Sequence, residues 1–366
     1  MLIILFFFLY KLYKMGGGLM QLVAMGAQDV YLTGNPQITF FKVVYRRHTN
    51  FSKECIEQTF NGSLSTGTGT LNCTLSRNGD LVQEIYLTGT YDSGDSGEDN
   101  TDMIKTVEVE IGGQKIDKHY SQWLDIYNEL FETESSHARR KLLAGTGGAS
   151  GTVYIPLRFW FNRNPGLALP LIALQYHEVK INVECKASAG GGKFTATPKL
   201  LVNYLYLDTD ERRRFAQVSH EYLIEQVQHT GKETKAKVTM NFNHPVKALF
   251  WTGGQWGTVK LQLNGHDRAA EQAKAYYQLV QPYECGLGHS ASIKANRTEG
   301  GVADSLVGMY SFCLKPAEHQ PSGTCNFSRI DNAVLNMGGD GDLYLFALNY
   351  NVLRIMSGMG GLAYSN

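Results

Sequence analysis

Apolar residues in this chain recur mostly at every second position, which is the period of a β-strand with one buried face. Residues 107–111 place valine and isoleucine at alternate positions with glutamate between them, and residues 238–243 alternate in the same way. Residues 343–348 are apolar on both faces, and so are residues 155–161 apart from Arg158. Two-sided strands of this kind are buried between sheets or at a domain contact. The pattern predicts a β protein.

Two segments have helical spacing instead. Between Trp123 and Phe131, five apolar side chains recur at the spacing of a helix, with glutamates off that stripe. Asp267 is placed to cap a second helix over residues 268–280, which are rich in alanine and glutamine. We expect both segments to be short helices in loops between strands.

The second half of the chain repeats three short patterns of the first half in the same order. The pairs are residues 81–89 with 245–253, residues 107–113 with 259–265, and residues 173–181 with 347–355. The spacing differs from pair to pair, so the loops diverged while the strand-like segments kept their identity. Each copy of the second pattern is followed by one of the two helix candidates. This arrangement indicates a duplicated domain.

With 366 residues, the chain is long enough for two domains with separate cores. Short strands separated by turns rich in glycine and asparagine favour two sandwiches in tandem over a parallel α/β fold. The charged run at residues 207–217 precedes the second set of repeats, and we expect the domain junction there. Both a solvated connector and a contact between subunits stay open as interpretations of this run.

The charges balance, with 34 Lys and Arg against 34 Asp and Glu and a formal net charge of zero. A neutral chain has no electrostatic reason to bind naked nucleic acid. Only 19% of residues are charged, while Gly reaches 39 and Tyr 20, which suits a β protein with many turns and much buried contact surface. A net charge near zero also removes one barrier to self-association.

Six cysteines are present, with no CxxC spacing and no histidine near enough to complete a zinc pattern. We interpret them as buried free thiols in a reducing compartment rather than as a disulfide framework.

Residues 1–13 form an apolar run that is too short to cross a bilayer as a helix. Lys11 and Lys14 follow the apolar stretch, whereas a signal peptide opens with its basic residues. Two interpretations stay open. Either translation starts at an upstream codon and Met15 is the ordinary start, or an apolar arm reaches a membrane or a partner.

Candidate catalytic residues are few. Ser96 lies in a Gly-Asp-Ser-Gly motif that resembles the surroundings of a serine-protease nucleophile, but in an acidic, turn-like run without a partner histidine. His220 lacks the second histidine of a zinc-protease helix, and His266 follows a tight turn. Residues 338–342 lack the loop length and the closing glutamate of a calcium site. We therefore expect no catalytic residue, no metal site and no cofactor.

Five Asn-X-Ser/Thr motifs are candidate glycosylation sites. Their acceptors are Asn50, Asn61, Asn72, Asn296 and Asn326. These sites matter only if the chain meets the glycosylation machinery of the secretory pathway. Because no signal peptide is recognisable, we interpret most of them as turn residues.

Several stretches resemble the major capsid proteins of nucleocytoplasmic large DNA viruses, above all those of algal viruses and their giant-virus relatives. Residues 26–42, GAQDVYLTGNPQITFFK, resemble the opening of these proteins, and residues 155–181 resemble the end of their first jelly roll. Residues 261–268 and 319–333 resemble second-domain motifs, and residues 349–365 resemble the C-terminal end. The resemblance extends from about residue 15 to the last residue.

The resemblance implies an all-β fold of two tandem eight-stranded jelly-roll sandwiches with short helices in loops. It divides the chain into an amino-terminal arm at residues 1–27, a first jelly roll at 28–211 and a second at 212–366. It implies a structural protein and no enzyme. Three copies would form a pseudo-hexameric capsomer, because two similar wedges about a threefold axis present six similar wedges. Such capsomers would tile an icosahedral shell over an inner membrane.

The implied partners are further copies of the chain, minor capsid proteins and the inner viral membrane, reached through the arm, with no direct nucleic acid. The implied location is the outer shell of the virion, after assembly in the host cytoplasm. Residues 19–50 are interpreted as an inner arm under the shell or as the first strand of the first sandwich. Phe159, Trp160 and Phe161 are expected either at a subunit contact or in the sandwich core.

The chain is shorter than many members of this family, so we expect trimmed outer loops. A minor capsid paralogue stays open as an alternative, as does a carbohydrate-binding coat protein for host attachment. A sandwich hydrolase that uses Ser96, His220 and His266 is the enzyme alternative.

Overall fold

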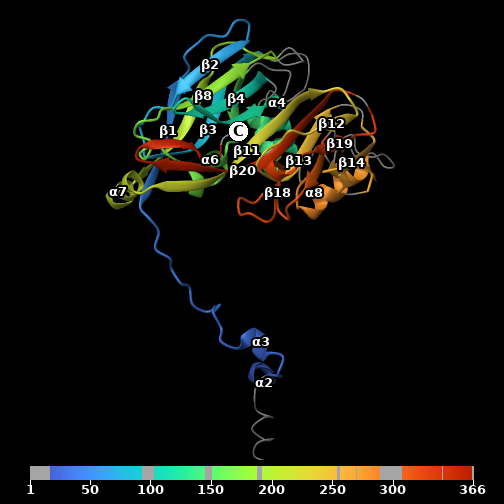
Figure 1. Ribbon diagram of the computed structural model, residues 1–366. Helices are drawn as coiled ribbons and strands as arrows, with labels where there is room; N and C mark the ends of the chain where they lie inside the picture. Colours follow the sequence, from blue (N-terminus) through green and yellow to red (C-terminus); the bar gives the residue numbers. More distant parts are fainter. Residues whose placement is uncertain are drawn as a thin grey trace, which may run out of the picture. The chain divides into compact units, whose positions relative to one another are not determined.

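The computed structural model describes residues 17–92, 103–144, 151–187, 192–253, 256–268, 270–288, 307–339 and 341–364. The chain divides into two units, Met1–Thr49 and Asn50–Asn366. All strands of the described residues lie in the second unit, where four antiparallel sheets form two sandwiches (Figure 1).

The first sandwich pairs two sheets, which we name by their first strands. The β1 sheet has the order β1 (Phe51–Thr59), β10 (Lys199–Leu207), β3 (Leu81–Asp92) and β6 (Gly151–Pro156), with the short β7 (Leu169–Pro170) and β9 (Lys193–Phe194) added to β3. The β2 sheet has the order β2 (Gly69–Thr74), β8 (Val179–Cys185), β4 (Ile104–Ile111) and β5 (Gln114–Tyr120). Its helical segments are α4 (Ser121–Leu130), α5 (Glu134–Ala144), α6 (Trp160–Arg163) and η2 (Pro165–Leu167).

The second sandwich is built in the same way. The β11 sheet has the order β11 (His220–Glu233), β20 (Leu343–Met356), β13 (Pro245–Gly253) and β17 (Gly308–Ser311), with β18 (Cys325–Asn326) on β13 and β21 (Met359–Leu362) on β20. The β12 sheet has the order β12 (Lys237–Thr239), β19 (Ala333–Asn336), β14 (Thr258–Leu263) and β15 (His266–Asp267), with β16 (Gln272–Ala273) on β14. Its helical segments are η3 (Tyr276–Val280), α8 (Gln281–Glu284) and η4 (Phe327–Arg329).

The two strand orders match position for position, with β1, β10, β3 and β6 corresponding to β11, β20, β13 and β17. The first two sequence repeats confirm the match, because they fall on β3 and β13 and on the hairpins that open with β4 and β14. Both hairpins turn over two residues in the left-handed region, Gly112 and Gly113 at φ 58° and 84°, and Asn264 and Gly265 at φ 50° and 77°. Such turns match the twist of the flanking strands. The predicted double sandwich is therefore confirmed.

The third repeat was wrong. Residues 173–181 form the loop before β8 and the start of that strand, whereas residues 347–355 lie in β20. The topological counterpart of β20 is β10, not β8. The reason is that alternation of apolar and polar residues specifies a strand with a buried face and says nothing of its place in the sheet.

The first helix prediction is confirmed by α4, whereas the helix predicted over residues 268–280 begins only at Lys274, so its predicted start at Asp267 was wrong. Asp267 lies in β15, where its carboxylate accepts from Lys260 Nζ and from Gln262 Nε2, both at 2.8 Å. Cross-strand partners have thus replaced the capping role. The helical stretch begins at Lys274 and continues through η3 and α8 to Glu284.

Residues 155–161 do not form one continuous strand. β6 ends at Pro156 and α6 begins at Trp160. The apolar side chains are nevertheless buried in the first core, with Phe159, Trp160 and Phe161 at most 2% exposed. Of the two expected locations, these residues therefore occupy the sandwich core.

The strand at residues 343–348 has both faces buried, as predicted. Leu345 and Ala347 belong to the core of the second sandwich, whereas Phe346 and Leu348 pack on the opposite face against α4 of the first sandwich. A helix that crosses from one sandwich to the other thus explains why this strand has no polar face.

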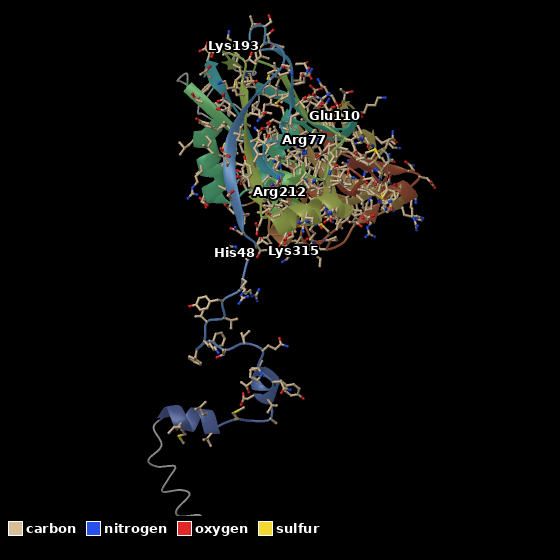
Figure 2. All side chains as sticks on the ribbon, turned by 90° about the vertical axis from the view of Figure 1, so that its left-hand side faces the viewer. His48, Arg77, Glu110, Lys193, Arg212 and Lys315 are labelled. Atoms are coloured by element: carbon tan, nitrogen blue, oxygen red, sulfur yellow. The ribbon has the colours of Figure 1, made fainter. Side chains whose placement is uncertain are left out.

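The charged run at the expected junction forms α7 (Thr209–Gln217), capped by the Asp208 carboxylate, which accepts from the Thr209 N–H at 2.8 Å. Its Arg212, labelled in Figure 2, pairs with Asp80 at 3.0 Å. Phe215 packs against an apolar cluster of the first sandwich. The junction is therefore an ordered helix attached to the first sandwich, and the boundary between 211 and 212, which lies inside it, stays a prediction.

Candidate assembly surfaces

The two sandwiches meet at an apolar seam built by α4. Trp123 is fully buried, and its ring centroid lies 5.5 Å from that of Phe250 and 5.9 Å from that of Phe346. Ile126 and Leu130, one and two turns further along α4, pack in the same cluster. Aromatic contacts of this size contribute beyond the area that they bury. The seam therefore holds the outer face of the β11 sheet firmly against the first sandwich.

The edge of β11 is also bonded to the first sandwich. The Val227 N–H donates to the Asp117 carboxylate at 3.0 Å, and the Gln226 side-chain amide donates to the Ile116 carbonyl. An edge strand normally presents unpaired backbone groups that invite a further chain. At β11, β5 of the same chain covers that edge.

A buried ionic cluster lies in the seam around Glu225, whose side chain is 6% exposed. One carboxylate oxygen accepts from Lys247 Nζ at 2.6 Å and the other accepts from Arg163 of α6. His319 Nδ1 lies 4.0 Å from Glu225 Oε1. Burial lowers the pKa of His319, and the Glu225 charge opposes that shift. Because a buried charge is costly without a partner, this cluster depends on both sandwiches.

A second cluster around Glu132 supports the first. Glu132 accepts from Arg140 Nε at 3.2 Å and from Arg158. The guanidinium carbons of Arg158 and Arg163 lie 5.2 and 5.0 Å from the ring centroid of Tyr127 on α4. Burial lowers the pKa of Arg158. Cation–π contacts of this kind link the two clusters through α4.

The outer face of the β1 sheet, in contrast to that of the β11 sheet, carries exposed ion pairs. Lys53 pairs with Glu84 at 2.9 Å, and Lys199 pairs with Glu57 at 2.6 Å, all with side chains between 35% and 51% exposed. Cys55 lies between them on β1 and is exposed. Exposed ion pairs contribute little to stability. This face therefore keeps its polar groups in water within a single chain.

The amino-terminal unit contains α2 (Gly17–Val23) and α3 (Val30–Thr33). All of its side chains whose burial is described are exposed, including Tyr31, Phe40, Phe41 and Tyr45 at 86% or more. Figure 2 shows side chains standing out from the ribbon of this segment. The described part of residues 19–50 holds no strand, so the strand interpretation of this segment was wrong and the first strand begins at Phe51. Across the described chain, no helix has the length and apolar character needed to cross a membrane.

The structure describes four of the five candidate glycosylation sites. Asn50, Asn61, Asn72 and Asn326 are exposed, while Asn296 lies outside the described residues. Asn61 and Asn72 face each other in an isolated bridge, and the Asn326 side chain accepts from the Ser328 N–H at 3.0 Å as the cap of η4. The turn and capping roles expected for such residues are thus present at Asn326, and glycosylation stays a prediction.

The catalytic candidates are not brought together. Ser96 lies outside the described residues. His220 in the β11 sheet contacts the Phe215 carbonyl at 2.9 Å and stacks on the Phe215 ring, whereas His266 is exposed in the β12 sheet. Among the described side chains, no group of three or more histidine, cysteine or acidic residues is placed to hold a metal ion.

The six cysteines are free thiols, as predicted, but only Cys73, Cys185 and Cys313 are buried, while Cys285 and Cys325 are partly exposed. Burial raises the pKa of Cys73 to about 11 and that of Cys185 to about 12, which keeps both protonated and unreactive. Cys55 differs because it is exposed.

Sequence reasoning missed the buried charges of the seam. Lys247 sits in the middle of the apolar strand β13, and Glu225 lies in β11. A lone lysine in an otherwise apolar strand is a signal for a buried ion pair, since lysine is almost never fully buried without a partner. The identity of the partner could not be read from the chain, because Glu225 and Arg163 come from distant segments.

Two jelly rolls of matching strand order, joined by a packed seam, define a double jelly-roll protein. A family model described as the major capsid protein N-terminus matches residues 39–208, and one described as the large eukaryotic DNA virus major capsid protein matches residues 211–255 and 256–361. The chain belongs to the major capsid proteins of large eukaryotic DNA viruses.

Individual relatives agree with this family. The chain is 55% identical to the major capsid protein of Pyramimonas orientalis virus and 41% identical to that of Paramecium bursaria Chlorella virus 1, in each case over 96% of this chain and 100% of the relative. The second alignment runs over 451 positions, more than the 366 residues of this chain, so that relative carries insertions. This difference agrees with the expectation of shortened loops.

Solved structures show the same fold. The capsid of Paramecium bursaria Chlorella virus 1 matches with a TM-score of 0.78 and 38% identity, over 90% of this chain and 100% of that one. The Faustovirus major capsid protein matches with a TM-score of 0.70 at 12% identity, over 91% and 94%. At that low identity the second match supports the fold alone.

Proposed function

We propose that three copies of this chain associate into a pseudo-hexameric capsomer that tiles the outer shell of a large DNA virus. The observation that carries the proposal is the pair of sandwiches with one shared strand order inside one chain. Three such chains about a threefold axis present six similar wedges and a nearly hexagonal outline, which can pave a shell. The protein acts as a structural subunit and needs no cofactor or catalytic residue for this role.

Native mass spectrometry of the purified chain tests the proposal. We expect a trimer at micromolar concentration, held by interfaces of the obligate class, which bury more than roughly 2,000 Å². A stable monomer under these conditions would contradict it. A minor capsid paralogue of the same fold would also form trimers, so its proportion in purified particles separates the two roles. Binding on a glycan array by a monomeric chain would favour the host-attachment alternative.

A second proposal concerns the amino-terminal unit, Met1–Thr49, which we assign to the inner viral membrane. Its exposed aromatic and aliphatic side chains stand beside three cations, Lys42, Arg46 and Arg47. Apolar side chains next to basic ones suit the interface of an anionic bilayer. Flotation with anionic vesicles should recover the full chain, while a variant lacking residues 1–49 should stay at the bottom of the gradient. Equal flotation of both proteins would refute the assignment.

A further inference from the structure

A cavity of about 180 Å³, which we call the seam pocket, lies where the two sandwiches meet. One wall is the segment of the first sandwich that carries α6 and η2, with Arg163 and Asn164. The other wall is Glu225 of β11 together with Ala317 and His319, which lie in the loop between β17 and β18. Because a water molecule takes up about 30 Å³ in the liquid, the pocket has room for roughly six waters or for one small ion with part of its hydration shell.

The loop wall of the seam pocket is fixed to the strands beneath it. Lys247 Nζ donates to the Glu318 carbonyl at 2.9 Å, and the Tyr350 hydroxyl donates to the His319 carbonyl at 3.0 Å. The Lys247 ammonium also lies 4.9 Å from the centroid of the Tyr350 ring. This wall is therefore held in place before any ligand enters, which lowers the entropic cost of binding.

The ionic groups around the pocket do not balance. Lys247 and Arg163 are both cations, and Glu225 is the carboxylate that they share. Burial lowers the pKa of His319, with Glu225 opposing the shift and Lys247 and Arg163 adding to it, so the imidazole is mostly neutral at pH 7. The group therefore has one positive charge in excess. Its ionic side chains are between 1% and 17% exposed, so water compensates this charge poorly.

The neighbouring buried carboxylates are occupied by other partners. Glu132 accepts from both Arg140 and Arg158, so it too is shared between two cations. Asp117 lies 2.9 Å from His119 Nε2. Within the described parts of the chain, no second carboxylate forms an ion pair with Arg163 or Lys247. The missing negative charge is not supplied by the seam itself.

Arg163 shows where that charge would bind. Its Nη1 donates to Glu225, and its Nε donates to the Arg158 carbonyl at 2.9 Å. Its Nη2 is buried and has no hydrogen-bond partner among the described residues. A buried donor without a partner is costly, and a hydrogen bond from a guanidinium to an anion is among the strong ones. At the rim, Asn164 Oδ1 accepts from the Gly166 N–H at 2.9 Å, and its Nδ2 amide is a further donor.

We infer that the seam pocket binds one small inorganic oxyanion of the phosphate type. The anion accepts from Arg163 Nη2 and supplies the negative charge that Glu225 alone does not. Glu225 does not exclude it, because Lys247 and Arg163 already lie on the two oxygens of that carboxylate. Bound there, the anion links α6 of the first sandwich to the loop of the second and stabilises the seam. The site lies within one chain, so it does not depend on the proposed trimer.

Isothermal titration calorimetry of the full chain with sodium phosphate, in a Hepes buffer without chloride, tests the inference. We expect saturable binding of one phosphate per chain. The melting temperature should rise by about 2 °C for each tenfold excess of phosphate over its dissociation constant. Excluded salts stabilise folded proteins in proportion to their concentration. No saturable heat, together with a melting temperature that rises only in proportion to the salt, would therefore overturn the inference.

Arg163→Lys is the matched variant for the proposed donor. Lysine keeps a cation beside Glu225 but lacks the forked guanidinium and its Nη2 group. We expect its affinity for phosphate to be weaker by about tenfold or more, since a charge-assisted hydrogen bond is lost. An affinity equal to that of the parent chain would overturn the inference.

Ala317→Asp gives a second test that leaves the ion pairs of Glu225 intact. Ala317 is exposed in the single chain, so the variant should fold with an unchanged circular dichroism spectrum. Its carboxylate enters the lining of the pocket and takes the place of the anion, so phosphate binding should be lost. The control is Ala196→Asp, which adds the same charge at an exposed position outside the pocket and should bind phosphate as the parent does.

Binding by Ala317→Asp as tight as that of the parent, or equal weakening by both aspartate variants, would overturn the inference. Native mass spectrometry separates its failure from that of the proposed function. A monomeric chain that binds phosphate as described would contradict the trimer and support the anion site. A trimeric chain without saturable phosphate binding would do the reverse.

Discussion

The β1 sheet and the β11 sheet share one backbone plan and have opposite outer faces. Tyr86 of β3 and Phe250 of β13 hold the same position in the first sequence repeat. Their cross-strand partners are Leu201 and Phe346, which pair in turn with Glu57 of β1 and His229 of β11. Glu57 therefore matches His229, and four residues earlier Lys53 of β1 matches Glu225 of β11. The Glu225 side chain is 6% exposed with Lys247 and Arg163 on its carboxylate, whereas the Lys53 side chain is 43% exposed and pairs with Glu84 in water. The comparison shows that burial under a neighbouring element determines how much an ion pair contributes to stability. The two matching positions both carry paired charges, but in very different dielectric environments.

The largest effect is expected for Trp123→Ala, which removes the anchor of α4 from the seam. Loss of a fully buried tryptophan should cost about 3–5 kcal/mol, from lost apolar burial and the cavity that remains. The comparison variant is Tyr86→Ala. Tyr86 holds the position in the β1 sheet that corresponds to Phe250, and Phe250 contacts the Trp123 ring in the seam. Chemical denaturation of both variants checks the difference. Equal destabilisation would show that the two faces are not as different as their burial indicates.

Glu225→Ala should follow, with a loss of about 3 kcal/mol, because it leaves Lys247 and Arg163 buried without their shared carboxylate. Lys53→Ala at the matching position should cost less than about 1 kcal/mol, since it breaks an exposed pair. Thermal unfolding of the two variants measures this contrast. An unchanged melting temperature for Glu225→Ala would show that the ionic cluster around Glu225 does not stabilise the fold.

Gly112→Ala tests the matching turns and should cost about 1–2 kcal/mol. Gly112 has φ 58°, and an added Cβ would lie 2.3 Å from His177 Nδ1, so both backbone strain and a clash arise. At the matching position, Asn264 already carries a side chain at φ 50°, and its carboxamide oxygen accepts from the Asp331 N–H at 2.9 Å. Gly113→Ala meets no atom within 4 Å and isolates the strain alone. If Gly112→Ala and Gly113→Ala are equally stable, the clash with His177 does not contribute to the loss of stability.

The smallest effect concerns pH. Burial lowers the pKa of His229 below its usual 6.5, because the ring is stacked on Phe346 with centroids 4.4 Å apart. The unfolded chain therefore binds a proton at a higher pH than the folded chain, so stability should fall as the pH drops below about 6.5. His229→Gln should flatten this dependence, while Glu57→Gln at the matching exposed position should leave its slope near pH 6 unchanged. Urea midpoints from pH 7.5 to 5.0 provide the measurement, and parallel curves for the parent and His229→Gln would contradict it.

Particular elements show how far the sequence could be read. Apolar alternation located β4, and helical spacing located α4, because both patterns depend on neighbours in the chain. The same reasoning failed at Asp267, where Lys260 and Gln262 across the hairpin supplied partners that no capping rule considers. It also failed for the third repeat, because β8 and β20 share a pattern and occupy different sheets.

The sequence by itself determined that the chain is a duplicated β protein of the capsid family, since periodicity, repeats and family motifs are all properties of order along the chain. Only the tertiary structure decided which of two equivalent faces is covered. That choice depends on which sheet α4 packs against in the folded chain. It also depends on the ion pairs that Glu225 forms with Arg163 and Lys247 from distant segments. Packing between distant segments sets burial, and burial sets the strength of each charge and each apolar contact.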